Sequence, residues 1–249
     1  MKGFTRRGRG QLDWWHVSSV RQNDVVMRVD SRDSVSLKPA ELDEIGQLLG
    51  AVGLPLRDDQ LDQHVEQFPL VTLSTNDDEL HGFLFGSLER IGGTPCILWG
   101  LGGVRRGRNA RPALDGLVAE LYRRAAISFP DEDVLVAGRF AQPSGYALLT
   151  VLTDVCPRPK YSPTGEERAW GRRLARRYGC DARYDDRQFR LKAGKVPELV
   201  LHAAAVKAGG KSAAEVVGTV EPVKGEAVIA FGWATAEALL DGLSPNGKH

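Results

Sequence analysis

The sequence has few cysteines, and their arrangement excludes two classes of site. Cys96, Cys156 and Cys180 are the 3 cysteines, and they lie far apart with neither CxxC nor Cys/His ligand spacing. A disulfide framework and a zinc site are therefore not expected, and we predict no metal ligands. Reduced, buried thiols in a cytoplasmic protein are the default for this pattern.

The chain also lacks an excess of either charge and any long apolar run. Its 33 Lys and Arg residues balance 32 Asp and Glu residues, which gives a net charge of +1. No global basic surface argues for nucleic acid as a partner. No apolar stretch reaches the roughly 20 residues that cross a bilayer, so no membrane partner is expected. The first residues carry arginines without a following apolar segment, so we expect no secretory signal.

The sequence offers few signals that would divide the chain into domains. A length of 249 residues suits one large domain or two small ones, and no internal repeat or low-complexity linker divides it. We expect an N-terminal extension over residues 1–33, a core over 34–160, and a C-terminal helix and strands over 161–249 that complete or extend the same domain. In the extension, Trp14 and Trp15 are expected to pack, and residues 25–29 could form a strand.

The stretch from residue 96 to 121 organises the rest. An apolar run at 96–99 suits a buried strand, and Gly100, Gly102 and Gly103 follow where a bulge would need residues without a Cβ. Four arginines lie between 105 and 111, and an apolar face at 3–4 spacing predicts a helix from Pro112. A helix start crowded by arginines is suited to an anion, most naturally phosphate. The alternative is an ordinary exposed turn with solvated arginines.

Flanking patterns predict further elements. We expect strands at 35–38, 70–74, 80–88, 134–137, 184–191, 199–205 and 228–231, and helices from 39, over 58–67 and over 235–243. Ser144 is expected to cap a helix that runs to residue 152. Thr164 and Glu167 have capping-box spacing at the start of a helix that Gly179 ends.

This order of elements resembles the GNAT superfamily of acyl-CoA-dependent N-acyltransferases over about residues 34–160, and residues 146–184 resemble a group of uncharacterised bacterial GNAT-like proteins. The resemblance implies an α/β (α+β) fold, with a mixed, mostly antiparallel sheet flanked by helices and a C-terminal extension. We predict that the strands at Cys96 and Val134 run parallel, because the helix between them is long enough for a parallel crossover. The resemblance implies that these two strands separate at the Leu101 end.

The loop before Pro112 is similar to the acyl-CoA signature of this family, (Q/R)-x-x-G-x-(G/A). Arg106 takes the first position, but Asn109 and Arg111 stand in the two glycine positions. Asn tolerates the left-handed conformation, so Asn109 is expected to keep the turn, whereas Arg111 would either clamp a phosphate or block the site. The cofactor-binding residues that the resemblance implies are Leu101, Arg106, Gly107, Arg108, Asn109, Ala110 and Arg111.

The activity implied is direct acyl transfer, with acetyl-CoA or another acyl-CoA as co-substrate and an amine of a small molecule or peptide as acceptor; a homodimer is possible. A bulge at 101–103 would turn backbone N–H groups toward the thioester, and the loop would hold the pyrophosphate. The family often has a tyrosine as general acid, and Tyr146 is the nearest candidate for a catalytic residue. His81 and Glu89 are further polar candidates that more often are surface residues. The alternative function is a catalytically inactive GNAT-like protein that binds CoA or a macromolecular partner.

Overall fold

The structure is a computed structural model, and it describes residues 21–22, 25–54, 56, 58–204, 206–207 and 210–240. The strands are β1 (Arg21–Gln22), β2 (Val25–Val26), β3 (Arg28–Asp33), β4 (Leu70–Asn76), β5 (Glu79–Ile91), β6 (Thr94–Val104), β7 (Val134–Phe140), β8 (Thr153–Cys156), β9 (Tyr184–Asp185), β10 (Arg190–Leu191), β11 (Leu201–His202) and β12 (Ala227–Ala234). The helices are α1 (Pro39–Ala51), α2 (Asp58–Gln67), α3 (Ala110–Ser128), α4 (Pro143–Tyr146), α5 (Gly165–Arg177), α6 (Gly210–Val217) and α7 (Ala236–Leu240).

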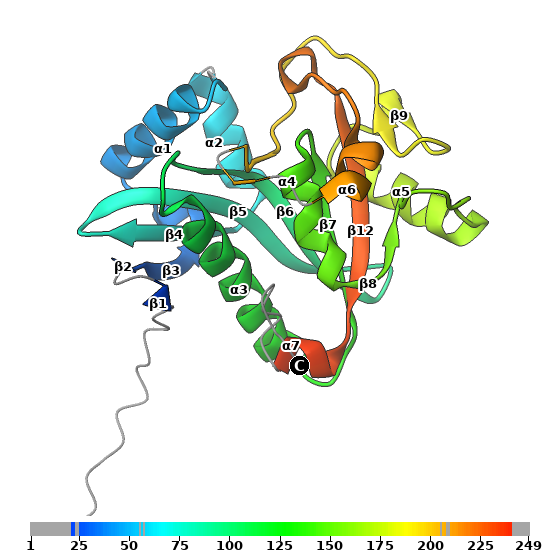
Figure 1. Cartoon of the computed structure of the whole chain (residues 1–249), viewed down its shortest axis with the longest axis horizontal. Helices are drawn as coiled ribbons and strands as arrows, with labels where there is room; N and C mark the ends of the chain where they lie inside the picture. The colour runs from blue at the N-terminus through cyan, green and yellow to red at the C-terminus, as the bar shows by residue number, and fades with distance from the viewer. Residues whose placement is uncertain are drawn as a thin grey trace, which may run out of the picture.

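One mixed sheet forms the centre of the molecule (Figure 1). Its strand order is β3-β4-β5-β6-β7-β12-β10-β9, with β11 paired to β6 and β8 paired to β12. Only β6–β7 and β11–β6 are parallel among the pairs of this sheet in the described ranges. The predicted fold class, a mostly antiparallel mixed sheet flanked by helices, is therefore confirmed.

The two parallel strands separate where the sequence predicted. β6 and β7 pair from Cys96 to Leu98 on one strand and from Leu135 to Ala137 on the other, and their pairing stops there. Helix α3 provides the crossover between them (Figure 1). The Leu101 end of β6 is thus free to pair with a different segment.

Two apolar layers cover the two faces of the sheet. Along β6, Ile97 and Trp99 pack in the layer that contains α3, while Cys96 and Leu98 pack in the layer that contains α1 and α5. This alternation is the period of two that a strand imposes on its side chains. Because both faces are covered, the central strands read as nearly continuous apolar runs.

Several local predictions are confirmed. α2 has the predicted bounds, and Thr164 is the N-cap of α5. Its hydroxyl accepts from the Glu167 amide at 3.2 Å, while the Glu167 carboxylate accepts from the Thr164 amide at 2.6 Å. Gly179, with φ of 70°, follows the end of α5 in the left-handed conformation. All three cysteines are free and buried.

Three predicted elements differ from the structure. The expected strand at 184–191 is instead two short antiparallel strands, β9 and β10. Residues 35–38 do not form a strand: a 3-10 turn covers Ser34–Ser36, and the sheet begins earlier, at β3. The Ser34 hydroxyl donates to the Val65 carbonyl of α2 at 2.8 Å, which draws the chain out of the sheet toward α2, and Val35 is 75% exposed. The predicted long helix from Ser144 is also wrong, since α4 is short and passes into a 3-10 turn over Ala147–Val151 and then β8.

Some of the remaining predictions concern residues that the structure does not describe, and others are answered by a single observation each. Trp14, Trp15 and residues 241–243 lie outside the described residues. Within the described ranges, no helix is both long and apolar enough to cross a membrane. The same ranges hold no group of three or more His, Cys, Asp or Glu side chains placed to bind a metal ion.

Candidate functional site

A β-bulge in β6 lies at the point where β6 and β7 part. Leu84 faces Gly102 and Gly86 faces Trp99, so β6 has one more residue than β5 in this interval. The extra residue falls at Gly100 and Leu101, as the glycines predicted. A Cβ on Gly100 would lie 2.6 Å from His64 Nε2, so glycine is required by the close approach of that side chain.

The amide that this bulge releases is already bonded within the protein. The Leu101 N–H donates to His64 Nε2 at 2.7 Å. His64 comes from α2, is 2% exposed, and stacks on Phe68 with ring centroids 4.5 Å apart. Burial and then the charge of Arg139 lower the pKa of His64 well below its usual 6.5, so the ring is neutral. Because Nε2 accepts from the amide, the proton of the neutral imidazole is on Nδ1.

The sequence contained a signal for His64 that was missed. His64 lies on the same side of α2 as Leu61, three residues earlier, and Phe68, four residues later and just past the end of the helix. A lone histidine on such a face is directed into the core and needs a buried partner. The pattern does not name that partner, which lies 37 residues away in the chain.

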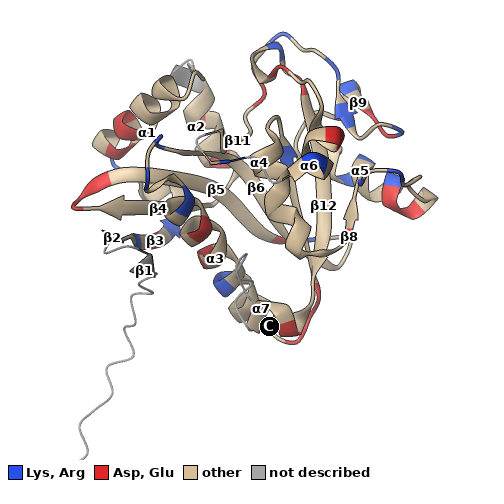
Figure 2. Ribbon diagram, viewed as in Figure 1, with Lys and Arg blue, Asp and Glu red and all other residues tan. Residues whose placement is uncertain are grey.

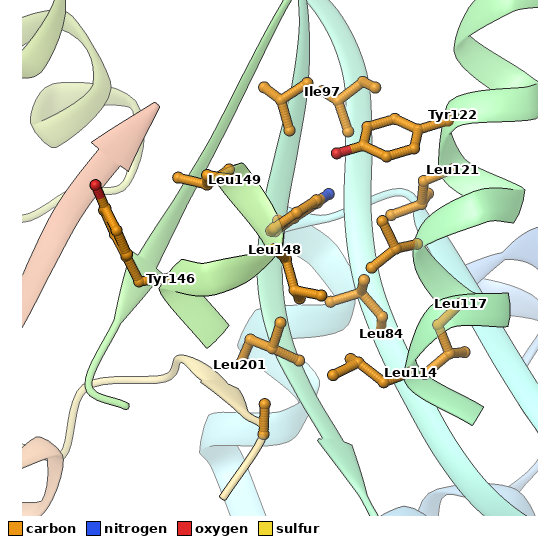
Figure 3. Packing of buried hydrophobic residues seen from close by; sticks show 14 of the residues in the cluster. Leu84, Ile97, Leu114, Leu117, Leu121, Tyr122, Tyr146, Leu148, Leu149 and Leu201 are labelled. Atoms are coloured by element: carbon orange, nitrogen blue, oxygen red, sulfur yellow. The ribbon is translucent and has the colours of Figure 1, made fainter. Parts of the chain in front are cut away.

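A segment from the C-terminal part of the chain fills the space between β6 and β7. Leu201 pairs with Gly102 and His202 with Gly103 in parallel register, and the Gly102 amide lies 3.4 Å from the Val200 carbonyl oxygen. Leu201 is 1% exposed and packs in the same apolar cluster as Leu84 (Figure 3). A Cβ on Gly102 would lie 2.8 Å from Leu201 Cδ1, so glycine at 102 makes room for this side chain.

The other edge of this segment is held by residues that follow β7. Gln142 Oε1 accepts from the Ala203 amide at 2.7 Å, and the Ser144 hydroxyl donates to the Ala203 carbonyl at 2.7 Å. Gln142 Nε2 also lies 3.4 Å from His202 Nδ1, and burial lowers the pKa of His202 to about 4. The Ser144 side chain therefore bonds to Ala203, the residue after β11, instead of capping a helix. This explains why the predicted long helix does not form.

A tyrosine spans the strands where they begin to part. The Tyr178 hydroxyl lies 3.2 Å from the Trp99 carbonyl of β6 and 3.1 Å from the Ala137 carbonyl of β7. Tyr178 is 4% exposed, and burial raises its pKa above the usual value of 10. Its hydroxyl supplies a donor to carbonyls of both strands where the two strands separate.

The backbone of the glycine-arginine loop before α3 differs from the prediction at Asn109. Asn109 has φ of −85° and ψ of −5°, a right-handed conformation, and the positive φ of the loop is at Gly107 (143°). The expected left-handed turn at Asn109 is therefore wrong, because Gly107 takes that role two residues earlier. Arg111 donates from Nε to both carboxylate oxygens of Asp115, at 2.8 and 2.7 Å, along the surface of α3.

The amides and arginines of this loop remain open to an anion. Ala110 donates to the Gly107 carbonyl at 3.2 Å, but no described residue accepts from the amides of residues 106–109. Arg106 and Arg108 are exposed, and neither forms an ion pair with a described residue. Figure 2 shows basic residues at this loop and at the first turn of α3. Free N–H groups and cations at a helix start suit a phosphate.

The polar candidates from the sequence are not brought to the bulge. The Tyr146 hydroxyl donates to the Pro157 carbonyl at 2.7 Å, and Figure 3 shows it pointing away from the apolar cluster. Tyr146 is 2% exposed, and burial raises its pKa to about 12. Glu89 accepts two hydrogen bonds from Arg177, at 2.6 and 2.8 Å, and His81 lies 3.7 Å from Glu79.

An acyl-CoA molecule thus fits one end of the implied site and not the other. At the pyrophosphate end, Arg106, Arg108 and the loop amides suit a phosphate. At the thioester end, His64 and Val200 already accept from the amides of Leu101 and Gly102, and Leu201 fills the space. The described arrangement therefore has no place for the pantetheine arm beside the bulge.

Comparisons with known proteins give weak likenesses of structure. No family model and no curated protein sequence matches this chain. Naa50 of Arabidopsis thaliana, solved with the bisubstrate analogue CoA-Ac-MVNAL, is similar with 13% identity and a TM-score of 0.33, over 51% of this chain and 85% of that one. A GCN5-related N-acetyltransferase from Kribbella flavida is similar with 13% identity and a TM-score of 0.35, over 63% of this chain and 45% of that one. Both TM-scores are below 0.5, so neither likeness carries an argument about what this chain binds or does.

Proposed function

We propose that this chain is a GNAT-like binding protein that does not transfer acyl groups. The observation that carries the proposal is the parallel pairing of β11 with β6 across the gap between β6 and β7. This pairing places Leu201 and His202 where the family resemblance implies the acyl-CoA thioester. Bonds from Gln142 and Ser144 to Ala203 hold the same segment from its other edge.

The residues around the bulge also do not supply the groups that acyl transfer requires. Acyl transfer needs N–H donors for the tetrahedral oxyanion and a route for the proton of the amine. The two amides at the bulge are already engaged, and His64 Nε2 is used as the acceptor of one of them. Tyr146 donates to the Pro157 carbonyl, so its proton is not directed at the gap.

One observation favours a second candidate, an acyl-CoA-dependent N-acyltransferase that acts when the segment at 200–203 withdraws. The exposed Arg106 and Arg108, with the open amides of residues 106–109, are suited to the pyrophosphate of acetyl-CoA or another acyl-CoA. An amine on a small molecule or peptide would then be the acceptor. Acetyl-CoA at 100 times its dissociation constant would raise the free energy of unfolding by about 2.7 kcal/mol.

Hydrogen exchange with and without acetyl-CoA separates the two candidates. For a binding protein without transfer, the amides of residues 200–203 keep their protection and no acetyl group reaches an amine acceptor. For the acyltransferase, acetyl-CoA speeds exchange at 200–203 because it must displace the β11 pairing. Faster exchange together with acetyl transfer would contradict the first proposal.

A double variant adds an independent check on the loop. Under the second candidate, Arg106→Ala with Arg108→Ala weakens acetyl-CoA binding by about 1.5–3 kcal/mol for each charge-assisted hydrogen bond that the change removes. Arg123→Ala is the matched control, because this exposed arginine of α3 is bonded to Glu120 at 2.7 Å and lies outside the loop. Equal calorimetric affinity in all three proteins would remove the loop from any acyl-CoA site.

A further inference from the structure

A second site lies on the face of the sheet covered by α2 and α5. A cavity of about 260 Å³ is lined there by Arg139 of β7, Tyr178, Arg183 and Glu198. The side chains of Gln60, Gln63, His64 and Gln67 from α2 complete much of its wall. Arg139 shares a face of β7 with Leu135 and Ala137, which belong to the layer of α1 and α5. The lining is therefore polar on the α2 side and charged on the β7 side.

The charged groups of this cavity do not balance. Glu198 accepts from Arg139 through Oε1 and from Arg183 Nη2 through Oε2, the latter at 2.7 Å. One carboxylate thus faces two guanidinium groups, and Glu198 is 5% exposed. The other titratable groups of the lining are neutral: burial lowers the pKa of His64 and raises the pKa values of Tyr178 and Cys180. The Arg183 side chain is 27% exposed, so water screens part of this excess positive charge, and an anion in the cavity would balance the remainder.

One edge of the Arg139 guanidinium group has no hydrogen-bond partner among the described residues. Its side chain is 6% exposed, and no described residue accepts from its buried Nε and Nη2 atoms. Two other arginines use this same edge to hold carboxylates. Arg177 binds Glu89 through Nε and Nη2 at 2.6 and 2.8 Å, and Arg123 binds Glu120 through the same two atoms at 2.7 Å each. The edge that Arg139 leaves open is therefore the one that fits two oxygens of a carboxylate.

The guanidinium group of Arg139 is fixed in place before any ligand arrives. Its third nitrogen, Nη1, donates to Glu198, and its carbon lies 4.6 Å from the centroid of the Tyr178 ring. Tyr178 is in turn held by the carbonyls of Trp99 and Ala137. A donor pair that is already oriented loses little conformational entropy on binding.

We propose that this cavity binds a small molecule with a carboxylate group, held by the Nε and Nη2 atoms of Arg139. The volume is below the roughly 300 Å³ at which most ligand pockets begin, which limits the molecule to a small metabolite. The side chains of Gln63 and Gln67 on α2 supply amide groups for the remainder of the molecule. The site is separate from the loop before α3, so this proposal stands or fails independently of acyl-CoA binding.

The test is a titration of the full chain followed by NMR of the arginine Nε–H signals. The probes are N-acetylglycine, glutarate and phenylacetate, each paired with its neutral amide and used up to about 10 mM. We expect at least one acid to shift the Arg139 signal, with its amide binding at least about tenfold more weakly. The Arg139 signal is assigned by triple-resonance experiments on the wild-type chain, so this titration requires no variant.

Two variants complete the design. Arg139→Lys keeps the positive charge but removes the two-donor edge, and it should weaken acid binding at least about tenfold. Arg123→Lys is the control, because its edge is occupied by Glu120, and it should bind as wild type does. The proposal is overturned if no acid binds, if acids and amides bind alike, if inorganic phosphate binds and the carboxylates do not, or if a folded Arg139→Lys variant binds as tightly as wild type.

Discussion

Acid should destabilise this protein well before its carboxylates are protonated, because His64 and His202 are buried in the neutral form. Burial lowers the pKa of His202 from 6.5 to about 4, and it lowers the pKa of His64 well below 6.5. Below about pH 6.5 the unfolded chain binds protons that the folded chain does not. The stabilisation is fully present above that pH and is lost as the pH falls toward the folded-state values.

The magnitude for His202 follows from its pKa difference. One pKa unit corresponds to about 1.36 kcal/mol, so a change from about pH 7.5 to about pH 5 removes about 2 kcal/mol of unfolding free energy through this residue. Burial raises the pKa values of the ion-paired carboxylates Glu120 and Glu167, but their hydrogen-bond and charged partners more than offset it and bring both pKa values below 4.5. The part of the loss that belongs to His202 is obtained by comparing wild type with a variant that lacks this imidazole.

Urea unfolding of wild type and His202→Asn at the two pH values measures the effect. Asparagine keeps an acceptor for the Gln142 amide and does not titrate, so the variant should lose about 2 kcal/mol less than wild type between the two conditions. The comparison requires that the unfolding free energy of the two proteins depends on urea concentration with the same slope. An identical pH dependence in the two proteins would refute the reasoning, since it would mean that His202 accepts its proton without unfolding.

Three further changes, with Gly46→Ala as a control for the first, test the packing at the bulge and one helix cap by urea unfolding. Gly100→Ala should destabilise by about 1–3 kcal/mol, because the new Cβ would lie 2.6 Å from His64 Nε2, whereas Gly46→Ala, with no atom within 4 Å, should stabilise by about 0.5–1 kcal/mol. Tyr178→Phe should cost about 1–3 kcal/mol, because the carbonyls of both parting strands lose their shared donor. Thr164→Ala should cost about 1 kcal/mol, because it removes the cap of α5. Wild-type stability in Gly100→Ala would contradict the close contact with His64, and in either other variant it would remove the stated hydrogen bond from the stability of the fold.

The sequence by itself determined the local elements and their order. Apolar spacing of two or of three to four residues predicted most strands and helices, and Thr164 with Glu167 predicted the start of α5. The glycines after Trp99 predicted the bulge, and the length of the helix after Pro112 predicted a parallel crossover. These features depend on residues a few positions apart, whose propensities and spacing are visible in the chain itself.

The backbone of the signature loop shows where local reasoning failed. Asn109 and Gly107 can both adopt a positive φ, and the sequence does not say which of them does so. In the fold Gly107 takes it, and Asn109 is then right-handed at the start of α3. The same holds for Ser144, whose hydroxyl could cap a helix but bonds to Ala203, 59 residues away.

Only the tertiary structure decided which groups meet at the candidate sites. The Leu101 amide finds its acceptor in His64, 37 residues distant, and Arg139 finds Glu198 at a separation of 59 residues. No local pattern marks Leu201 as the residue that fills the gap in the sheet, because any buried leucine has the same preference for an apolar neighbour. Burial and partners far apart in the chain set the charge state of a histidine and the open edge of an arginine, and both arise only when the sheet and its covering helices are assembled.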